Sequence, residues 1–177
     1  SKQDSLAGTV KLIVPGWLNT DIVWIWVPEI VWKGELAMWW VCKIWPWWKS
    51  RNIAAMAARL LWENKVATIW KTSRDEFWLW KKPVEALEKA GVNIDFIKIL
   101  DFNETWKMPW IALIPVDKDW NNQIYSIPWI NEDFCEKDID DAEEIFKIAW
   151  KNADSNWGWA VAYSMEMPFK TILHSMD

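Results

Sequence analysis

Residues 45–61 read Trp-Pro-Trp-Trp-Lys-Ser-Arg-Asn-Ile-Ala-Ala-Met-Ala-Ala-Arg-Leu-Leu and hold the strongest structural signal in the chain. The second half predicts an amphipathic helix, because apolar residues recur at i, i+3, i+4 and i+7 from Ile53. Ser50 is predicted to cap this helix, which leaves free N–H groups of the first turn beside Lys49 and Asn52. These two side chains offer a cation, a donor and an acceptor, a mixture that suits hydroxyl groups. An ordinary capped core helix explains the pattern equally well.

Strand-like apolar segments alternate with helical segments along the rest of the chain. This order is typical of βαβ units with a mostly parallel sheet. Gly91 is expected to end one of the helices, and Pro83 is expected to kink it. The predicted strands cover residues 11–15, 65–70, 94–100, 111–116, 123–127 and 159–163, with two more inside 23–41. The predicted helices cover residues 53–61, residues 138–149 and a segment that begins with a cap at Thr72 or Ser73 and ends at Ala90.

Several segments resemble, in the same order, the motifs of one protein family. Residues 46–52 resemble Pro-Gly-Gly-Lys-x-x-Asn, with tryptophan in place of both glycines. The other matches are Asn19-Thr20-Asp21 with Asn-x-Asp, residues 74–78 with Asp-Asp-x-Phe-Gly, 88–92 with Lys-Ala-Gly-Val, 112–127 with a pair of strands around Asp-x-Asp-Gly-x-Asn, and 165–168 with Leu-Glu-x-Pro. From about residue 11 to residue 171, the chain is therefore similar to the ribokinase (PfkB) family of carbohydrate kinases.

The resemblance implies an α/β fold of the ribokinase-like type, with a three-layer βαβ core, a mostly parallel sheet and a small β-sheet lid. Residues 1–177 would form one partial domain that binds the substrate, with lid segments at approximately residues 22–42 and 94–127. The family's Gly-Ala-Gly-Asp motif, which holds phosphate and the catalytic aspartate, has no match here. The catalytic residues and the nucleotide-binding part are therefore expected beyond Asp177, and the fragment is expected to be inactive.

The activity implied by the resemblance is an ATP-dependent transfer of the γ-phosphoryl group to a sugar hydroxyl. ATP and Mg²⁺ are the implied cofactors, bound by residues outside this chain. The expected partners are a sugar or nucleoside substrate and a second copy of the protein, paired through the lid. Two alternatives stay open, a nucleoside kinase of the same family and a non-catalytic sugar-binding or interaction domain.

Seven residues are candidates for substrate binding, and none for metal binding. Asn19 and Asp21 follow an apolar strand, where a carboxylate can accept hydrogen bonds from vicinal hydroxyls, although a strand-ending turn is the commoner role of these residue types. The resemblance implies sugar contacts by the two residues before Lys49 and by Glu166 at the opposite sheet edge. The full set is Asn19, Asp21, Trp47, Trp48, Lys49, Asn52 and Glu166.

Tryptophan is the most unusual feature of the composition. The chain has 20 Trp and only 5 Gly, although glycine usually makes up about 7% of residues. An indole cannot replace a glycine that is needed for positive φ or for close backbone approach. Errors of sequence assignment should therefore appear as positive φ angles with exposed or clashing side chains. Tryptophan stands at family glycine positions 47, 48, 62, 78, 106, 120 and 129, and we expect such errors at Trp47, Trp48, Trp78, Trp120 and Trp129 in particular.

Charge and cysteine content exclude other classes of function. The net charge of −5 with scattered lysines argues against a nucleic-acid-binding surface. Cys42 and Cys135 are far apart in the sequence with no Cys or His nearby, so neither a disulfide framework nor a zinc site is expected. A polar start and the lack of an apolar run of about 18 residues predict a cytoplasmic protein. The acidic residues of 138–144 are predicted to form a solvated helix face, and His174 is not expected to be catalytic.

Overall fold

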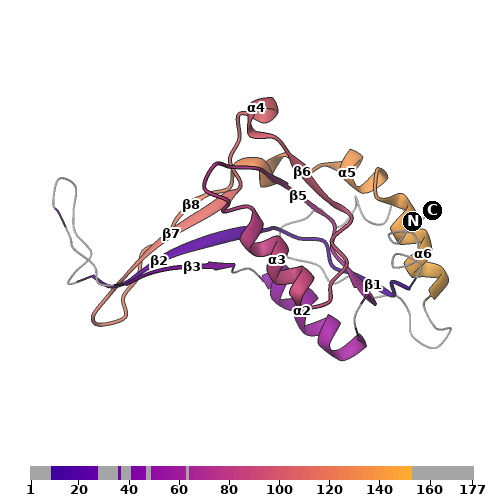
Figure 1. The fold of residues 1–177 in the computed structure, drawn as a ribbon, viewed down its shortest axis with the longest axis horizontal. Coiled ribbons are helices and arrows are strands. Elements are labelled where there is room, and N and C mark those ends of the chain that lie inside the picture. Colours follow the sequence, from indigo (N-terminus) through magenta and orange to yellow (C-terminus); the bar gives the residue numbers. More distant parts are fainter. Residues whose placement is uncertain (1–8, 28–35, 37–40, 47–48, 63, 153–177) are drawn as a thin grey trace.

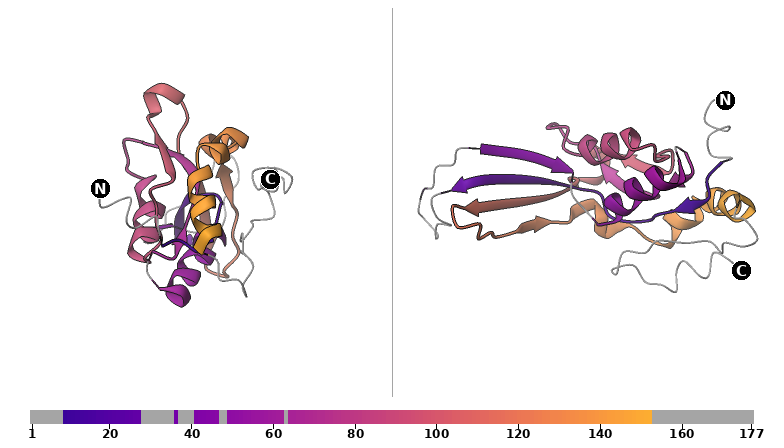
Figure 2. Two further views of the ribbon diagram at one scale, coloured as in Figure 1. Left: turned by 90° about the vertical axis from the view of Figure 1, so that its right-hand side faces the viewer. Right: turned by 90° about the horizontal axis from the view of Figure 1, so that it is seen from below.

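The computed structural model describes residues 9–27, 36, 41–46, 49–62 and 64–152. These residues form a part in which helices pack against short parallel strands, and a four-stranded sheet that reaches away from the helices (Figure 1). The right-hand view of Figure 2 places this sheet at one end and helix α6 (Glu143–Asn152) at the other. None of the helices in these residues combines the length and apolar character that a membrane span needs.

Two pairs of short parallel strands run through the α/β part. Strand β1 (Leu12–Ile13) pairs with β4 (Val66–Ala67), and β5 (Trp70–Ser73) pairs with β6 (Ile97–Leu100). Every residue of β4 and β5 is buried, as expected for parallel strands that are covered by other elements. The predicted α/β arrangement with mostly parallel pairing is therefore confirmed.

Helices α2 (Lys49–Leu61) and α3 (Lys81–Lys89) pack side by side (Figure 1), and α2 also packs against β4. Helix α2 buries Ala54 and Ala58, which lie one turn apart on the same face. Three residues of the face predicted from apolar spacing, Met56, Leu60 and Leu61, are exposed, so the small residues mark the buried face better than the large ones do. The fully buried core includes Val10, Ile13, Val14, Leu18, Val66, Ile69, Leu87, Ile139 and Ile145.

The four-stranded sheet has the order β3-β2-β7-β8. Its strands are β2 (Asn19–Val27), β3 (Val41–Pro46), β7 (Trp110–Asp117) and β8 (Tyr125–Ile127). Strands β2 and β7 run parallel, whereas β3 and β8 are antiparallel to their neighbours. Residues 97–100, which fall in the second predicted lid segment, pair with β5 and lie outside this sheet.

Glycine ends helix α3 as predicted. Gly91 has φ +79° and follows the C-cap residue Ala90. Its N–H donates to the Glu88 carbonyl oxygen at 2.9 Å, and the Val92 N–H donates to the Leu87 carbonyl oxygen at 3.1 Å. This pair of bonds is the Schellman motif, which satisfies carbonyl groups at a helix end.

The predicted start of this helix at Thr72 or Ser73 is wrong, since both residues belong to strand β5. The carboxylate of Asp75 accepts hydrogen bonds from the backbone N–H groups of Phe77, Leu79 and Trp80, and this turn delays the helix until Lys81. Pro83 consequently lies in the first turn, where a missing N–H breaks no helical hydrogen bond, and the predicted kink does not occur.

The helix predicted over residues 138–149 is divided into α5 (Glu136–Asp140) and α6. Two further short helices that the sequence did not predict are α4 (Phe102–Thr105) and the 3-10 helix η1 (Trp129–Asp133). Helix α4 begins at a local signal, because the Asp101 carboxylate accepts from the Asn103 N–H at 2.9 Å.

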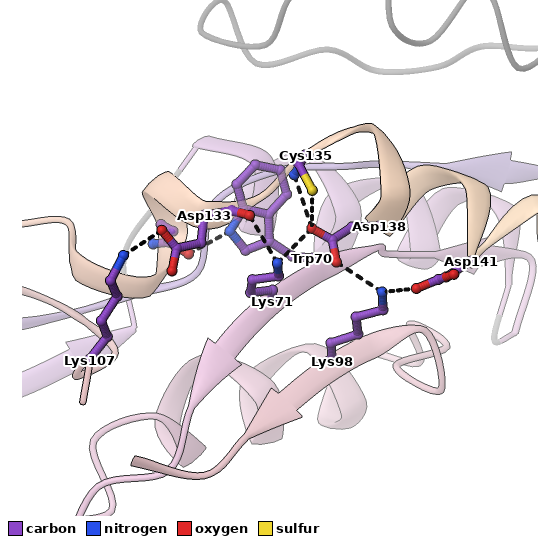
Figure 3. Close-up of polar contacts among 9 residues, drawn as sticks. Trp70, Lys71, Lys98, Lys107, Asp133, Cys135, Asp138 and Asp141 are labelled. Carbon is purple, nitrogen blue, oxygen red and sulfur yellow. Dashed lines mark hydrogen bonds and ion pairs between the residues drawn. The ribbon is translucent and has the colours of Figure 1, made fainter. Parts of the chain in front are cut away.

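Asp138 of α5 is the centre of an ion-pair network that joins α5 to β5 and β6 (Figure 3). Its buried carboxylate accepts from Lys71 Nζ at 2.7 Å and from Lys98 Nζ at 2.9 Å. Lys98 also pairs with Asp141. The prediction that the acidic residues of 138–144 are solvated is therefore wrong for Asp138, whereas Asp140, Asp141, Glu143 and Glu144 are exposed.

Burial disfavours the charged form of Asp138, but hydrogen bonds from Lys71, from Lys98 and from the backbone N–H of Cys135 outweigh it and lower the pKa from 3.8 to about 2. The ionised carboxylate therefore stabilises the folded state at neutral pH. This contribution, about 2 kcal/mol for a shift of this size, is lost as the pH falls from about 4 through about 2.

We predict that Asp138→Asn lowers the free energy of unfolding at pH 7 by about 3 to 5 kcal/mol, because it leaves the buried Lys71 ammonium without its ion partner. Urea denaturation measures the change. Asp140→Asn is the control on the same helix, and its effect should stay within about 0.5 kcal/mol because Asp140 is exposed. Equal effects of the two substitutions would contradict the structural role of Asp138.

Candidate functional site

Strand β2 begins with three buried polar residues, Asn19, Thr20 and Asp21. Because side chains alternate along a strand, Asn19 and Asp21 share one face and Thr20 lies on the other. The Thr20 hydroxyl donates to the carbonyl oxygen of Leu79 at 2.7 Å, which ties the start of the strand to the segment before α3. Asn19 and Asp21 thus belong to a strand and not to the strand-ending turn that residue type alone favoured.

Asn19 and Asp21 form a hydrogen-bonded pair that has acceptor capacity left over. The Asn19 side-chain nitrogen Nδ2 donates to Asp21 Oδ1 at 2.7 Å, and the exposed fractions of the two residues are 2% and 6%. Asn19 Oδ1 is buried and has no hydrogen-bond partner among the described residues. A buried acceptor left unpaired is unfavourable. The pair is therefore suited to a ligand that brings hydroxyl donors.

Burial raises the pKa of Asp21 from 3.8 to about 6, although the hydrogen bond from Asn19 lowers it in part. The carboxylate is consequently ionised for the most part at neutral pH and becomes protonated in mildly acidic solution. An ionised carboxylate only accepts hydrogen bonds, whereas the protonated form also donates one. The ability of Asp21 to accept two hydroxyl donors should therefore depend on pH near 6.

The first turn of α2 carries two more of the predicted site residues, Lys49 and Asn52. Lys49 is exposed and Asn52 is partly buried. Ser50 is not the cap that was predicted, because the helix already begins at Lys49. The Ser50 hydroxyl instead donates to the carbonyl oxygen of Trp17 at 3.1 Å and holds the first turn against the chain that leads into β2.

Close packing brings the starts of β2 and α2 together. A Cβ atom on Gly16 would lie 2.2 Å from Ser50 Cβ, so only glycine leaves room for this contact. On the other side, Thr20 pairs with Pro46, the last residue of β3 and three positions before Lys49. Both connections place the turn that carries Lys49 beside the strand that carries Asp21.

Arg51 is a residue of this turn that sequence reasoning passed over. Its Nη1 donates to Asn52 Oδ1, so the Asn52 amide nitrogen remains the group with which Asn52 can contact a ligand. Arg51 Nε is buried and has no partner among the described residues. Burial lowers the pKa of Arg51, with a further contribution from repulsion by Arg59. In the sequence, the only indication that Arg51 belongs to the site was its position inside the motif of residues 46–52.

The structure thus brings together Asn19 and Asp21 and places Lys49 and Asn52 on the adjoining helix. Trp47, Trp48 and Glu166, the other three predicted site residues, lie outside the described residues. Within the described ranges, no group of three His, Cys, Asp or Glu side chains could hold a metal ion.

We predict that Asn19→Ala raises the pKa of Asp21 above about 6, because it removes the hydrogen bond that favours the ionised carboxylate. A carbon-detected NMR titration of the Asp side chains measures this pKa. The matched control is Asn93→Ala, which breaks the same Asn-x-Asp contact to Asp95, where Asn93 Nδ2 lies 3.3 Å from Asp95 Oδ2. The control should leave the titration of Asp21 unchanged, and an equal shift in both variants would contradict a direct effect.

Comparisons with protein-family models and with curated proteins found no match to the chain. Solved structures do match. A ribokinase from Cryptococcus neoformans var. grubii serotype A in complex with ADP is 26% identical with a TM-score of 0.54, and the match covers 67% of this chain and 34% of that one. A ribokinase from Arabidopsis thaliana complexed with ribose and ATP is 23% identical with a TM-score of 0.67, covering 80% and 43%.

A nucleoside kinase from Methanocaldococcus jannaschii, described as an archaeal member of the ribokinase family, is 15% identical with a TM-score of 0.53, covering 68% of this chain and 38% of that one. The chain thus spans less than half the length of each of these three proteins. The parallel α/β part, the four-stranded sheet and these likenesses together show that the chain has a ribokinase-like fold.

Proposed function

We propose that this chain supplies the substrate-binding part of a PfkB-type kinase that transfers the γ-phosphoryl group of ATP to a sugar hydroxyl. The observation that carries the proposal is the buried Asn19–Asp21 pair, whose unpartnered amide oxygen lies next to a carboxylate at the start of β2. The ribokinase-like fold supports it, because solved structures with this fold include ribokinases, one of them in complex with ribose and ATP.

The chemistry of the pair fits vicinal hydroxyl groups. Asp21 and Asn19 Oδ1 would each accept a hydrogen bond from a sugar hydroxyl, and a hydrogen bond to a charged group contributes about 1.5 to 3 kcal/mol. Lys49 and the Asn52 amide would donate to sugar oxygens from the first turn of α2. Trp47, Trp48 and Glu166 enter the proposed site through the motif resemblance alone.

The task of these residues is to hold the acceptor hydroxyl in a fixed position. Positioning supplies a large share of the rate in phosphoryl transfer, which has little covalent chemistry for the protein to perform. When bound, ATP would supply the phosphoryl group and Mg²⁺ would neutralise its charge. The described residues contain no cluster suited to the metal, and the sequence has no Gly-x-Gly-Asp motif, so no residue of this chain is assigned to the transfer step.

The four-stranded sheet is the proposed lid over the sugar. Strand β2 carries the Asn19–Asp21 pair at its buried start and continues outward to Val27, with β3 and β7 on either side. A lid on the same strand as the binding pair can couple closure to substrate contact. In the proposal, the described part of the lid is β2 from Ile22 onward together with β3, β7 and β8.

A nucleoside is the second candidate substrate, because a nucleoside kinase shares the fold. A ribose ring with vicinal hydroxyls occurs in both substrate classes, so the Asn19–Asp21 pair suits either one. Titration calorimetry of the whole protein with D-ribose and with adenosine separates the two. Binding of ligand without phosphoryl transfer by the whole protein would favour the non-catalytic alternative.

We predict that Asp21→Asn in the whole protein weakens sugar binding at pH 8 by about 1.5 to 3 kcal/mol, because an amide donates where the carboxylate accepts. In the unsubstituted protein, the affinity should fall as the pH drops through about 6 and Asp21 becomes protonated. This pH dependence should vanish in the variant. Calorimetry with D-ribose measures both effects.

The control is Asp95→Asn, which alters a carboxylate of the other Asn-x-Asp contact. It should leave the sugar affinity and its pH dependence unchanged. Unchanged sugar affinity in Asp21→Asn would refute the assignment of Asp21.

A second copy of the protein is the proposed partner of the four-stranded sheet. Both edge strands expose apolar side chains, Ile44 and Trp45 in β3 and Tyr125 and Ile127 in β8. We predict a dimer by light scattering coupled to size exclusion, and Ile127→Glu should convert it to a monomer. Leu60→Glu, at an exposed position on α2, should leave the dimer intact. Loss of the dimer in both variants, or in neither, would contradict pairing through the sheet.

A further inference from the structure

Six tryptophans of the described residues have left-handed backbone conformations. They are Trp26, Trp62, Trp78, Trp106, Trp120 and Trp129, with φ between 42° and 75°. Positive φ is uncommon for residues other than glycine and is concentrated in Asn, Asp and His. Among the described non-glycine residues with positive φ, only Asn64 is not a tryptophan. Bulky side chains are strained in this conformation, so chance does not explain six tryptophans there.

Each of the clearest cases lies where a chain ordinarily uses glycine. Trp106 is the C-cap of α4, and its N–H donates to the Phe102 carbonyl oxygen at 2.7 Å. Trp62 follows the last residue of α2 directly. A helix end of this kind favours glycine at its left-handed position. Gly91, with φ +79°, fills the same role after α3.

The tryptophans in turns and at a β-bulge also lie where a chain ordinarily uses glycine. Trp120 lies in the connection between β7 and β8, where its N–H donates to the Asp117 carbonyl oxygen at 3.1 Å. Trp78 lies in the Asp75 turn before α3. Trp26 lies where the register between β2 and β7 shifts, and glycine is the usual left-handed residue of such a bulge.

Burial against the rest of the protein does not explain why these six positions carry an indole side chain. Trp26, Trp62, Trp78, Trp106 and Trp120 are between 53% and 82% exposed, and Trp129 is 37% exposed. Tryptophan is a residue that proteins bury to a large extent on average. A side chain that is exposed and also strains its backbone contributes little to the fold.

The motif resemblance identifies the same positions independently. It assigns glycine to residues 62, 78, 106, 120 and 129, and all five tryptophans there have positive φ, so the predicted backbone signature is confirmed for them. Trp26 adds a sixth position that the motifs did not cover. Trp47 and Trp48 lie outside the described residues.

We propose that residues 26, 62, 78, 106, 120 and 129 are glycine in the protein made by its own organism. A single codon that is read as tryptophan under one set of decoding rules and as glycine in that organism would produce this pattern. The proposal does not extend to positions whose backbone suits any residue, such as Trp80 with φ −55°. It is independent of the proposed kinase function, because backbone conformation and exposure support it without the motif resemblance.

Peptide mass spectrometry of the protein purified from its own organism tests the proposal directly. The masses of the peptides that span these positions should correspond to a glycine residue at each of the six. The gene should also use the same codon at all six positions. Tryptophan masses at these positions would overturn the proposal, whether or not the protein binds sugar.

Thermal unfolding of a recombinant protein that carries all six tryptophans provides a second test. Trp78→Gly and Trp78→Ala both remove the indole, but only glycine relieves the left-handed backbone. The glycine variant should melt about 2 to 4 °C above the alanine variant. At the control position Trp80, glycine should give no advantage over alanine. Equal melting temperatures for both variants at Trp78 would contradict the backbone argument.

Discussion

Strand β2 is the element on which the proposed site depends, because it begins inside the protein and is paired along both edges. Its pairing with β3 and β7 holds the backbone of Asn19 to Asp21, and the Thr20 bond to Leu79 ties the same three residues to the segment before α3. A second tie comes from Asn131, whose amide donates to the Leu18 carbonyl oxygen at 3.1 Å. With the backbone fixed in this way, the Asn19–Asp21 contact is held in one geometry.

Two aspartates show how one side chain serves binding or stability according to its surroundings. Burial raises the pKa of Asp21 to about 6, because only one hydrogen bond from Asn19 offsets it. Burial acts on Asp138 as well, but two lysines and a backbone N–H lower its pKa to about 2. Asp138 has its charge compensated within the fold and is a structural residue. The Asp21 carboxylate can accept further hydrogen bonds, which is the property expected of a binding residue.

The parts of the structure that local sequence determines were predictable. Apolar runs predicted β1, β4, β6, β7 and β8 to within a few residues, and Gly91 predicted the end of α3, because both signals act through neighbouring residues. Strands β3 and β5 were not predicted at their observed positions, and the predicted strand over 159–163 lies outside the described residues. Asn19, Asp21, Lys49 and Asn52 were identified through motif resemblance, and the structure places the first two in contact. Whether these four residues bind sugar remains a prediction.

Features that depend on distant residues were not predictable in the same way. The burial of Asp138 requires Lys71 and Lys98, which come from two strands far away in the sequence. The late start of α3 arises because Asp75 captures backbone N–H groups that a continuous helix would have used. The inward face of α2 is set by how closely its neighbours approach, which favours Ala54 and Ala58 over the larger apolar residues.

A crystal structure of the whole protein with bound D-ribose tests the central claim most directly. The proposal predicts that two neighbouring sugar hydroxyls lie within hydrogen-bond distance of Asp21 and of Asn19 Oδ1, so that the amide oxygen is no longer unpartnered. A sugar bound elsewhere, with the Asn19–Asp21 pair untouched, would contradict the assignment of β2 as the substrate-binding strand.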